Sequence, residues 1–249
     1  MESKIKYTLS EIESAHGIKL LYACESGSRA WGFPSPDSDY DIRFIYCRPV
    51  EDYLSIRAFK DSIRLPIIDD LDIEGWDIFK TLQLMSKSNT TVFEWLQSPI
   101  VYFENEDLKN GLWKLSQSYF CPRSNIHHYL GIAKGALASI NEDRIKIKKL
   151  FYVLRPLLAA LWCAERNSIA PMDMQSLMEL LPKDLSEKIL SLIKLKSGSD
   201  ESSIIEVDKD LKLWINNTYF YCEEKSGVLE KRIFDIDLAD NFLRKLILK

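Results

Sequence analysis

The spacing of apolar and polar residues predicts β-strands in the first half of the chain. Residues 19–25 form an apolar run that ends in Ser-Gly-Ser, a pattern typical of a buried strand that leads into a tight turn. Residues 39–47 are rich in β-formers and alternate at their start, and residues 70–76 alternate again. We therefore expect at least three strands that can share one sheet.

Helical spacing is found before and after these strands. Ser10 and Glu13 fit a capping box that would open a short helix, and Gly17 would end it. Residues 77–86 follow the third strand with the apolar spacing of a helix, and Asp77 is a plausible N-cap. These patterns predict helices that flank the sheet.

From about residue 124 the strand signals largely disappear and helical periodicity takes over. Residues 145–162 predict a long apolar-rich helix that Pro156 should kink. The polar stretch 196–200 is typical of a linker. Further helical periodicity is found in three segments, 184–195, 204–222 and 237–248.

Length and composition fit a two-domain globular protein. The chain has 249 residues, of which 46% are hydrophobic and 28% are charged, so it can bury a substantial core. We expect an α+β fold, with a catalytic domain over residues 1–120 that contains a mixed sheet with flanking helices. A helical domain over residues 121–249 would follow and close the cleft of the first domain.

Charge and targeting signals narrow the class of function. The net charge of −4 argues against a broad surface for nucleic acid, although a local basic groove is compatible with it. The five cysteines are far apart and predict buried thiols in a reducing compartment. No signal peptide is recognised, and no apolar stretch approaches the roughly 18 residues that span a bilayer. We therefore expect a cytoplasmic protein without a membrane partner.

Two carboxylates stand at a spacing that predicts a cation site. Ten residues separate Gly27-Ser28 from Asp39, and Asp41 follows two positions later in the predicted strand. Residues two apart in a strand face the same side, so the two carboxylates would converge and repel unless a cation lies between them. Mg²⁺, or Mn²⁺ in its place, fits best, because it binds carboxylates and completes its shell with water and phosphate oxygens.

A third carboxylate would complete this metal site, and the third strand offers three. Asp72 and Glu74 share one face of that strand, and Asp77 lies just beyond them. We favour Asp72, because Asp77 would be occupied as a helix cap. Asp77 remains the alternative, and Glu74 stays open.

Phosphate could be held by the turn that precedes the carboxylates. Glycine lets the main chain of Gly27 and Ser28 approach a phosphate closely, and the Ser28 hydroxyl could add a hydrogen bond. Arg29 is well placed to neutralise triphosphate charge. Arg43 could do the same, or it could pair with the carboxylates on its own face of the strand.

A basic face on the long helix is a second candidate for nucleotide contacts. Lys148, Tyr152 and Arg155 recur at helical spacing, and Lys149 belongs to the same basic group. Tyr152 could stack on a nucleobase while Arg155 binds phosphate. Simple packing between domains explains the same pattern equally well.

Gly27-Ser28, ten residues and Asp39-x-Asp41 resemble the signature of the DNA polymerase beta superfamily of nucleotidyltransferases. The longer stretches 25–32 and 38–46 are similar to its RlaP-type branch, which is associated with RNA repair. Further similar stretches bring the resemblance to roughly residues 20–162, and they are found at 72–77, 87–89, 94–100 and 149–159.

The resemblance implies the fold of that superfamily and a reaction. A nucleoside monophosphate would move from a nucleoside triphosphate to an acceptor hydroxyl, possibly of RNA, and pyrophosphate would leave. A transferase that acts on a protein or a small molecule is an alternative, as is a nucleotide-binding regulatory or antitoxin-like module without turnover. The sequence makes no prediction of the oligomeric state.

Overall fold

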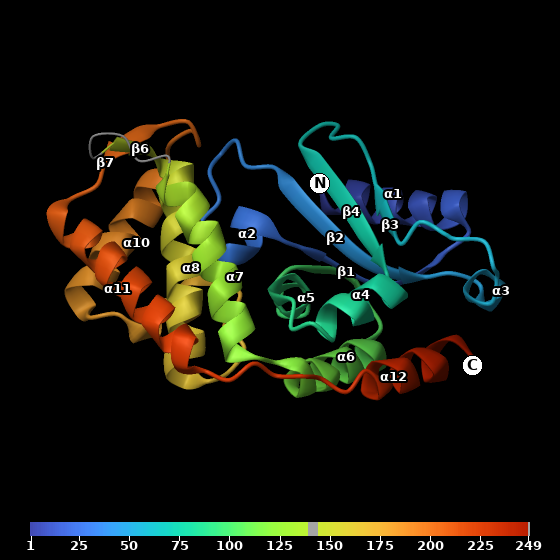
Figure 1. Cartoon of the computed structure of the whole chain (residues 1–249). Coiled ribbons are helices and arrows are strands. Elements are labelled where there is room, and N and C mark those ends of the chain that lie inside the picture. Colours follow the sequence, from blue (N-terminus) through green and yellow to red (C-terminus); the bar gives the residue numbers. More distant parts are fainter. Residues whose placement is uncertain (139–143, 249) are drawn as a thin grey trace. The chain divides into compact units, whose positions relative to one another are not determined.

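The computed structural model describes residues 1–138 and 144–248, and it has the predicted α+β character (Figure 1). The chain folds into two compact units, and each is built from more than one stretch of sequence. The first unit comprises Met1–Ala30, Asp39–Tyr119 and Ile233–Lys249, and the second comprises Trp31–Ser38 and Phe120–Arg232.

A mixed sheet with the strand order β3-β4-β2-β1-β5 forms the centre of the first unit. β1 pairs antiparallel with β2 and β5, β3 pairs antiparallel with β4, and β2 and β4 run parallel. The strand predicted at 19–25 is confirmed, whereas β2 begins one residue after Asp39. The five strands are β1 (Lys19–Glu25), β2 (Tyr40–Cys47), β3 (Ser62–Arg64), β4 (Leu71–Asp77) and β5 (Val101–Glu104).

Helix α1 (Glu2–His16) covers one face of this sheet. The helix begins at Glu2 and not at Ser10 as predicted, because its buried positions Ile5, Leu9 and Ile12 already have helical spacing upstream of Ser10. Gly17 ends it with a φ of 59°, as predicted. The core that α1 shares with the strands also contains Leu20, Ala23, Ile42, Phe44, Tyr46, Ile63, Leu71 and Ile73.

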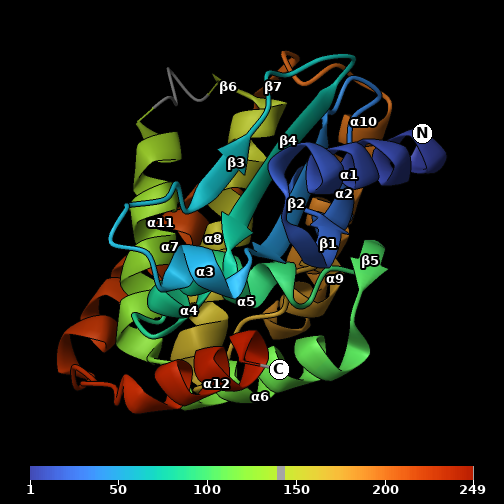
Figure 2. The ribbon, with the colours of Figure 1, turned by 90° about the vertical axis from the view of Figure 1, so that its right-hand side faces the viewer.

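Helices α4 (Ile78–Met85) and α5 (Thr90–Trp95) belong to the other side of the sheet. Trp76 faces away from the α1 side of β4, and its ring lies 4.2 Å from that of Trp95. The Asp77 side chain accepts the Phe79 N–H at 2.8 Å, so the predicted N-cap of α4 is confirmed. Figure 2 shows α4 and α5 near the end of β4, away from α1.

The C-terminal helix α12 (Asp237–Ile247) belongs to the first unit, together with α6 (Glu106–Tyr119). The Tyr119 hydroxyl donates to the Asp235 carbonyl at 2.7 Å and accepts the Ala239 N–H at 3.0 Å. The helix predicted at 237–248 is therefore present, but it packs with the sheet unit and not with the helical one.

The second unit is mainly helical. Helices α7 (Pro122–Leu137), α8 (Ile147–Arg166) and α11 (Lys209–Val228) pack on one another, and α9 (Met174–Leu177) and α10 (Lys183–Ser197) accompany them. α8 continues through Pro156. Within the described residues, no helix is long and apolar enough to cross a membrane.

Three predicted boundaries in the second unit are wrong. β6 (Arg144–Lys146) and β7 (Ile204–Glu206) form an antiparallel pair where helix was predicted, because their backbone groups bond to each other. The start of the polar stretch 196–200 is not a linker, because α10 extends to Ser197 and Lys196 is buried in its last turn.

Candidate active site

Asp41 and Asp72 lie side by side on adjacent parallel strands. Asp41 on β2 is the register partner of Asp72 on β4. Paired residues of neighbouring strands point to the same face of a sheet, so both carboxylates face away from α1. The structure thus brings together two of the three carboxylates that the sequence singled out.

Arg43 bridges this carboxylate pair. Its Nη2 donates to Asp41 Oδ1 at 2.9 Å and to Asp72 Oδ2 at 2.7 Å. Its Nη1 donates to the main-chain carbonyls of Asp72 at 2.7 Å and Ile42 at 3.0 Å. Of the two roles predicted for Arg43, the structure supports pairing with the carboxylates.

One carboxylate oxygen of the pair is unsatisfied. Asp72 Oδ1 is buried and accepts no hydrogen bond from any described residue. A buried charged oxygen without a partner carries a desolvation cost that a cation or a donor would relieve. The unsatisfied oxygen therefore points to a ligand beside Asp72.

Gly27 lies directly against the Asp41 carboxylate. Gly27 has a φ of 60°, and a Cβ placed on it would be 1.9 Å from Asp41 Oδ2. The next helix, α2 (Gly27–Trp31), starts at this residue, and the preceding Ser26 N–H donates to the Asp41 carbonyl at 2.8 Å. A side chain here would displace the Asp41 carboxylate, so the predicted turn and the predicted carboxylate lie directly against each other.

Glu25 supports this site from the end of β1, and sequence reasoning gave it no role. It is fully buried, its Oε1 accepts the Asp41 N–H at 2.7 Å, and its Oε2 accepts a hydrogen bond from the Tyr102 hydroxyl. Burial raises the pKa of Glu25, and the Tyr102 hydrogen bond opposes this shift. A charged residue at the end of an otherwise apolar strand was the signal that could have identified it.

Asp39 and Arg29 lie at the start of β2. Asp39 precedes the strand and is exposed, unlike Asp41. The Arg29 guanidinium stacks on the Tyr40 ring, 3.8 Å from its centroid, and its Nε donates to the Asp39 carbonyl at 3.2 Å. These contacts hold Arg29 beside Asp39, while Ser28 is half-buried within α2.

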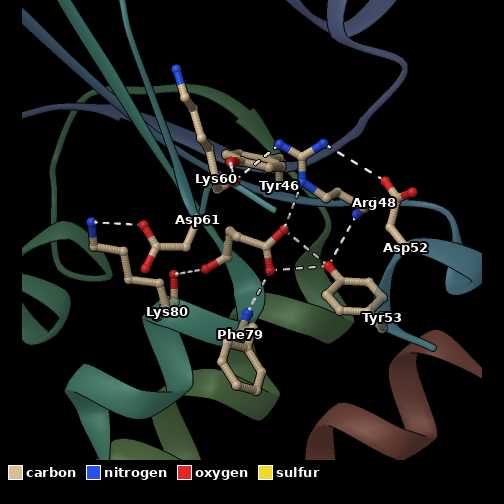
Figure 3. A network of polar contacts seen from close by, with 10 residues as sticks. Tyr46, Arg48, Asp52, Tyr53, Lys60, Asp61, Phe79 and Lys80 are labelled. Carbon is tan, nitrogen blue, oxygen red and sulfur yellow. Dashed lines mark hydrogen bonds and ion pairs between the residues drawn. The ribbon is translucent and has the colours of Figure 1, made fainter. Parts of the chain in front are cut away.

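The alternative ligand Asp77 lies elsewhere on β4. It is five residues beyond Asp72, which places it at the opposite end of the strand and on the opposite face. Its carboxylate accepts the Tyr53 hydroxyl, at 3.0 Å and 3.1 Å to its two oxygens, and its Oδ2 lies 3.8 Å from Arg48 Nε. Figure 3 shows Tyr53 and Arg48 within this separate network, next to helix α3 (Val50–Tyr53).

Glu74 is also engaged by its neighbours. It shares the face of Asp72, and its Oε1 accepts the Trp76 Nε1–H at 2.9 Å. Of the three candidate ligands Asp72, Glu74 and Asp77, only Asp72 lies opposite Asp41 and has a buried carboxylate oxygen without a hydrogen bond.

The basic face of α8 is largely engaged within the second unit. Arg155 is buried, and its Nε and Nη2 donate to the Met172 carbonyl at 3.0 Å and 2.9 Å. Lys148 pairs with Glu201, and Tyr152 meets the Trp31 ring edge-on. These contacts give Arg155 a packing role inside the second unit, whereas the alternative left open was packing between domains. Lys149 is exposed on the same helix.

The residues present fit a divalent cation that a nucleotide helps to hold. The described residues contain no group of three or more His, Cys, Asp or Glu side chains positioned around one ion. Mg²⁺ is commonly bound by only one or two carboxylates together with substrate phosphates and water. Asp41 and Asp72 supply two carboxylates, and the unsatisfied Asp72 Oδ1 supplies a vacant ligand atom.

Comparisons with known proteins identify a family for this chain. The model of the family described as RlaP, RNA repair pathway DNA polymerase beta family, matches residues 1–245. The uncharacterized protein YcgL of Bacillus subtilis (strain 168) is 45% identical over 204 residues, which cover 81% of this chain and 78% of YcgL. A crystal structure of a nucleotidyltransferase-like protein from Exiguobacterium sibiricum 255-15 aligns with 97% of this chain and 79% of that chain, at 11% identity and a low TM-score of 0.31.

Proposed function

The chain belongs to the RNA repair pathway DNA polymerase beta family, RlaP, and we propose on this basis that it is a metal-dependent nucleotidyltransferase. It would move a nucleoside monophosphate from a nucleoside triphosphate to an acceptor hydroxyl. The observation that carries this proposal is the Asp41 and Asp72 pair, pressed against Gly27 and left with an unsatisfied buried oxygen.

The two carboxylates would hold Mg²⁺ or Mn²⁺. When bound, such an ion neutralises phosphate charge and lowers the pKa of an attacking hydroxyl. Asp41 and Asp72 would bind the ion, and Asp39, exposed before β2, would be the third ligand. Arg43 would keep the two buried carboxylates parallel and limit their repulsion.

The main chain at Gly27 and Ser28 would approach the triphosphate, because no Cβ stands between this turn and the carboxylates. Arg29 beside Asp39 would balance phosphate charge. The acceptor oxygen would form a bond to the α-phosphorus while the bond to the bridging oxygen breaks. Pyrophosphate would leave with the electron pair, and the hydroxyl proton would pass to a carboxylate or to water.

The acceptor is proposed as RNA, with a protein or small-molecule hydroxyl as the competing class. The family description supports RNA. The net charge of −4 supports an acceptor that needs only a local contact surface. Both readings keep the same site and the same reaction.

Label transfer from α-³²P nucleoside triphosphates tests the proposal. The protein is incubated with each nucleotide, with Mg²⁺ or Mn²⁺, and in turn with RNA, protein and small-molecule acceptors. Asp41→Asn and Asp72→Asn should each lower transfer by at least about a hundredfold, because positioning and charge neutralisation supply most of the catalysis. Asp107→Asn, on the exposed start of α6, is the matched control and should leave transfer unchanged.

The outcome separates the competing functions. Label on one acceptor class, lost in both site variants, supports the transferase and identifies its acceptor. Nucleotide binding without transfer to any acceptor, and with equal affinity in both site variants, would leave a nucleotide-binding regulatory or antitoxin-like module and refute the enzyme.

A further inference from the structure

The two halves of the candidate site are joined by a segment that folds with the other unit. Gly27, Ser28, Asp39 and Asp41 belong to the first unit, whereas Trp31–Ser38 between them belongs to the second. The last residue of this segment, Ser38, is bonded directly to Asp39, the candidate ligand that precedes β2. Whatever holds Ser38 therefore bears on the backbone at Asp39.

Aromatic contacts hold the first part of the segment. The Arg155 guanidinium carbon lies 4.4 Å from the centroid of a Trp31 ring, and Tyr152 meets the same side chain edge-on. Phe33 is buried and stacks on Phe151 with ring centroids 4.6 Å apart. These contacts fix residues near the start of the segment and leave its last residues to be held in another way.

A buried lysine holds the last part of the segment. Lys196, in the final turn of α10, is only 1% exposed. Its Nζ donates to Ser35 Oγ at 2.7 Å and lies 3.8 Å from Glu201 Oε1. Burial lowers the pKa of Lys196, and the Glu201 carboxylate opposes that shift.

Glu201 extends the same network to the end of the segment. Its Oε1 accepts the Ser38 hydroxyl at 2.8 Å, and its carboxylate also pairs with Lys148. Its main-chain N–H donates to the Asp37 carboxylate at 3.2 Å. Ser38, which ends the network, is the residue directly before Asp39.

The segment also forms a turn that presents its hydroxyls to this network. Ser35 N–H donates to Ser38 Oγ at 2.9 Å, and Ser38 N–H donates to the Ser35 carbonyl at 3.1 Å. Both serines are buried. Lys196 therefore binds a closed turn, so that fixing Ser35 also fixes Ser38.

We propose that Lys196 is a positioning residue for the candidate site: by holding the Ser35–Ser38 turn against α10, it fixes the backbone of Ser38, to which Asp39 is directly bonded. The proposal rests on the proposed nucleotidyltransferase function. Stability alone gives little reason for a lysine here, because an apolar side chain of similar length avoids the cost of burying an ammonium group. A role in positioning the candidate site would explain why residue 196 is a charged lysine.

Lys196→Met tests the proposal, with Lys194→Met as the matched control. Lys194 lies two residues away on the same helix and is exposed. Methionine keeps the length and burial of the side chain and removes the bond to Ser35 together with the longer ion pair to Glu201, so the variant should fold. Ser35→Ala removes the other partner and gives an independent route if Lys196→Met does not fold.

Hydrogen exchange over residues 33–41 is the first measurement. Exchange there should rise about tenfold in Lys196→Met and in Ser35→Ala, which is the loss expected for one hydrogen bond to a charged group. Peptides of the first-unit sheet remote from this segment should be unaffected. The double variant should exchange no faster than Lys196→Met alone, because Ser35→Ala removes a bond that Lys196→Met has already removed.

Turnover at saturating nucleotide is the second measurement. Displacing the Asp39 carboxylate should lower kcat at least about tenfold and raise the Mg²⁺ concentration that gives half-maximal rate, at a temperature where the variant is fully folded. Loss of stability alone would not move the Mg²⁺ requirement. Lys194→Met should match the wild type in both measurements.

The results distinguish failure of this inference from failure of the proposed function. Unchanged exchange over 33–41 in folded Lys196→Met, or raised exchange with unchanged kcat and Mg²⁺ requirement, overturns the role of Lys196. Absence of transfer in the wild type with every acceptor overturns the enzyme itself, and the exchange result then decides separately whether Lys196 fixes the chain that leads into Asp39.

Discussion

Replacing Gly27 with alanine would place a methyl group against the Asp41 carboxylate. The Cβ would lie 1.9 Å from Asp41 Oδ2, closer than any real contact, so the carboxylate or the turn must move. Two costs add. Alanine at a φ of 60° costs about 1–2 kcal/mol, and displacing Asp41 from Arg43 loses a charge-assisted bond of about 1.5–3 kcal/mol.

Gly17→Ala separates these two costs. Gly17 has nearly the same φ, 59°, and no described atom lies within 4 Å of where its Cβ would be. It should therefore lose only the backbone cost of about 1–2 kcal/mol. The two variants are compared by urea unfolding and by Mg²⁺-dependent label transfer.

Gly27→Ala should be the less stable by about 2 kcal/mol, and only this variant should lose transfer. Equal losses of unfolding free energy and intact transfer in both variants would show that the turn and the Asp41 carboxylate do not form one site.

Two further substitutions test charged residues near the two ends of the parallel strands β2 and β4. Arg43→Gln should lower the free energy of unfolding by about 2–3 kcal/mol, because it removes the charged partner of two half-buried carboxylates. Mg²⁺ should restore part of this loss in thermal unfolding, and an equal loss with and without the ion would contradict the cation site. Asp77→Asn keeps an acceptor for the Phe79 N–H and should leave transfer intact. Because burial raises the pKa of Asp77 above its ordinary 3.8, the folded state binds this proton more tightly than the unfolded state. The unfolding free energy of the wild type should thus fall relative to that of Asp77→Asn as pH rises from about 3.8 through the raised pKa, and level off above it. Urea unfolding between about pH 3 and pH 8 checks the sign, and a difference that grows in the opposite direction would refute it.

Much of the sheet could be predicted because its signals are local. The apolar run at 19–25 indicates a strand that is buried on both faces, and the alternation at 70–76 indicates a strand that is buried on one face. Both patterns can be recognised within a few residues of sequence. The cap at Asp77 was predictable for the same reason, since the capping oxygen and the N–H that it accepts are two residues apart.

The pairing of strands could not be read in the same way. That Asp41 lies opposite Asp72 depends on the parallel register of β2 and β4, which are separated by more than twenty residues of sequence. The preference for Asp72 over Asp77 came from the expected cap and not from register. The sequence also left two roles open for Arg43, because its bridge to Asp72 depends on the same strand register.

Lys196 shows where sequence reasoning fails in the helical unit. A lysine followed by Ser-Gly-Ser is typical of an exposed linker, and burial of its ammonium depends on a partner 161 positions away, Ser35. The division of the chain near residue 120 has the same weakness. It places Trp31–Ser38 in the sheet domain and α12 in the helical one, and long-range packing decides otherwise in both cases.

The bridge from Arg43 to Asp41 and Asp72 also bears on how a cation would enter. Two carboxylates and one guanidinium carry one net negative charge, so the site is stable without a metal and still attracts one. A divalent ion would compete with Arg43 for Asp41 Oδ1 and Asp72 Oδ2, whereas the buried Asp72 Oδ1 has no hydrogen bond to give up. Binding of Mg²⁺ alone should therefore be weak. Triphosphate oxygens would supply the missing ligands, so the affinity for the ion should rise when nucleotide is present. Titration of Mn²⁺ with and without a nonhydrolysable nucleotide measures this coupling, and equal affinities would mean that ion and nucleotide do not share the Asp41 and Asp72 site.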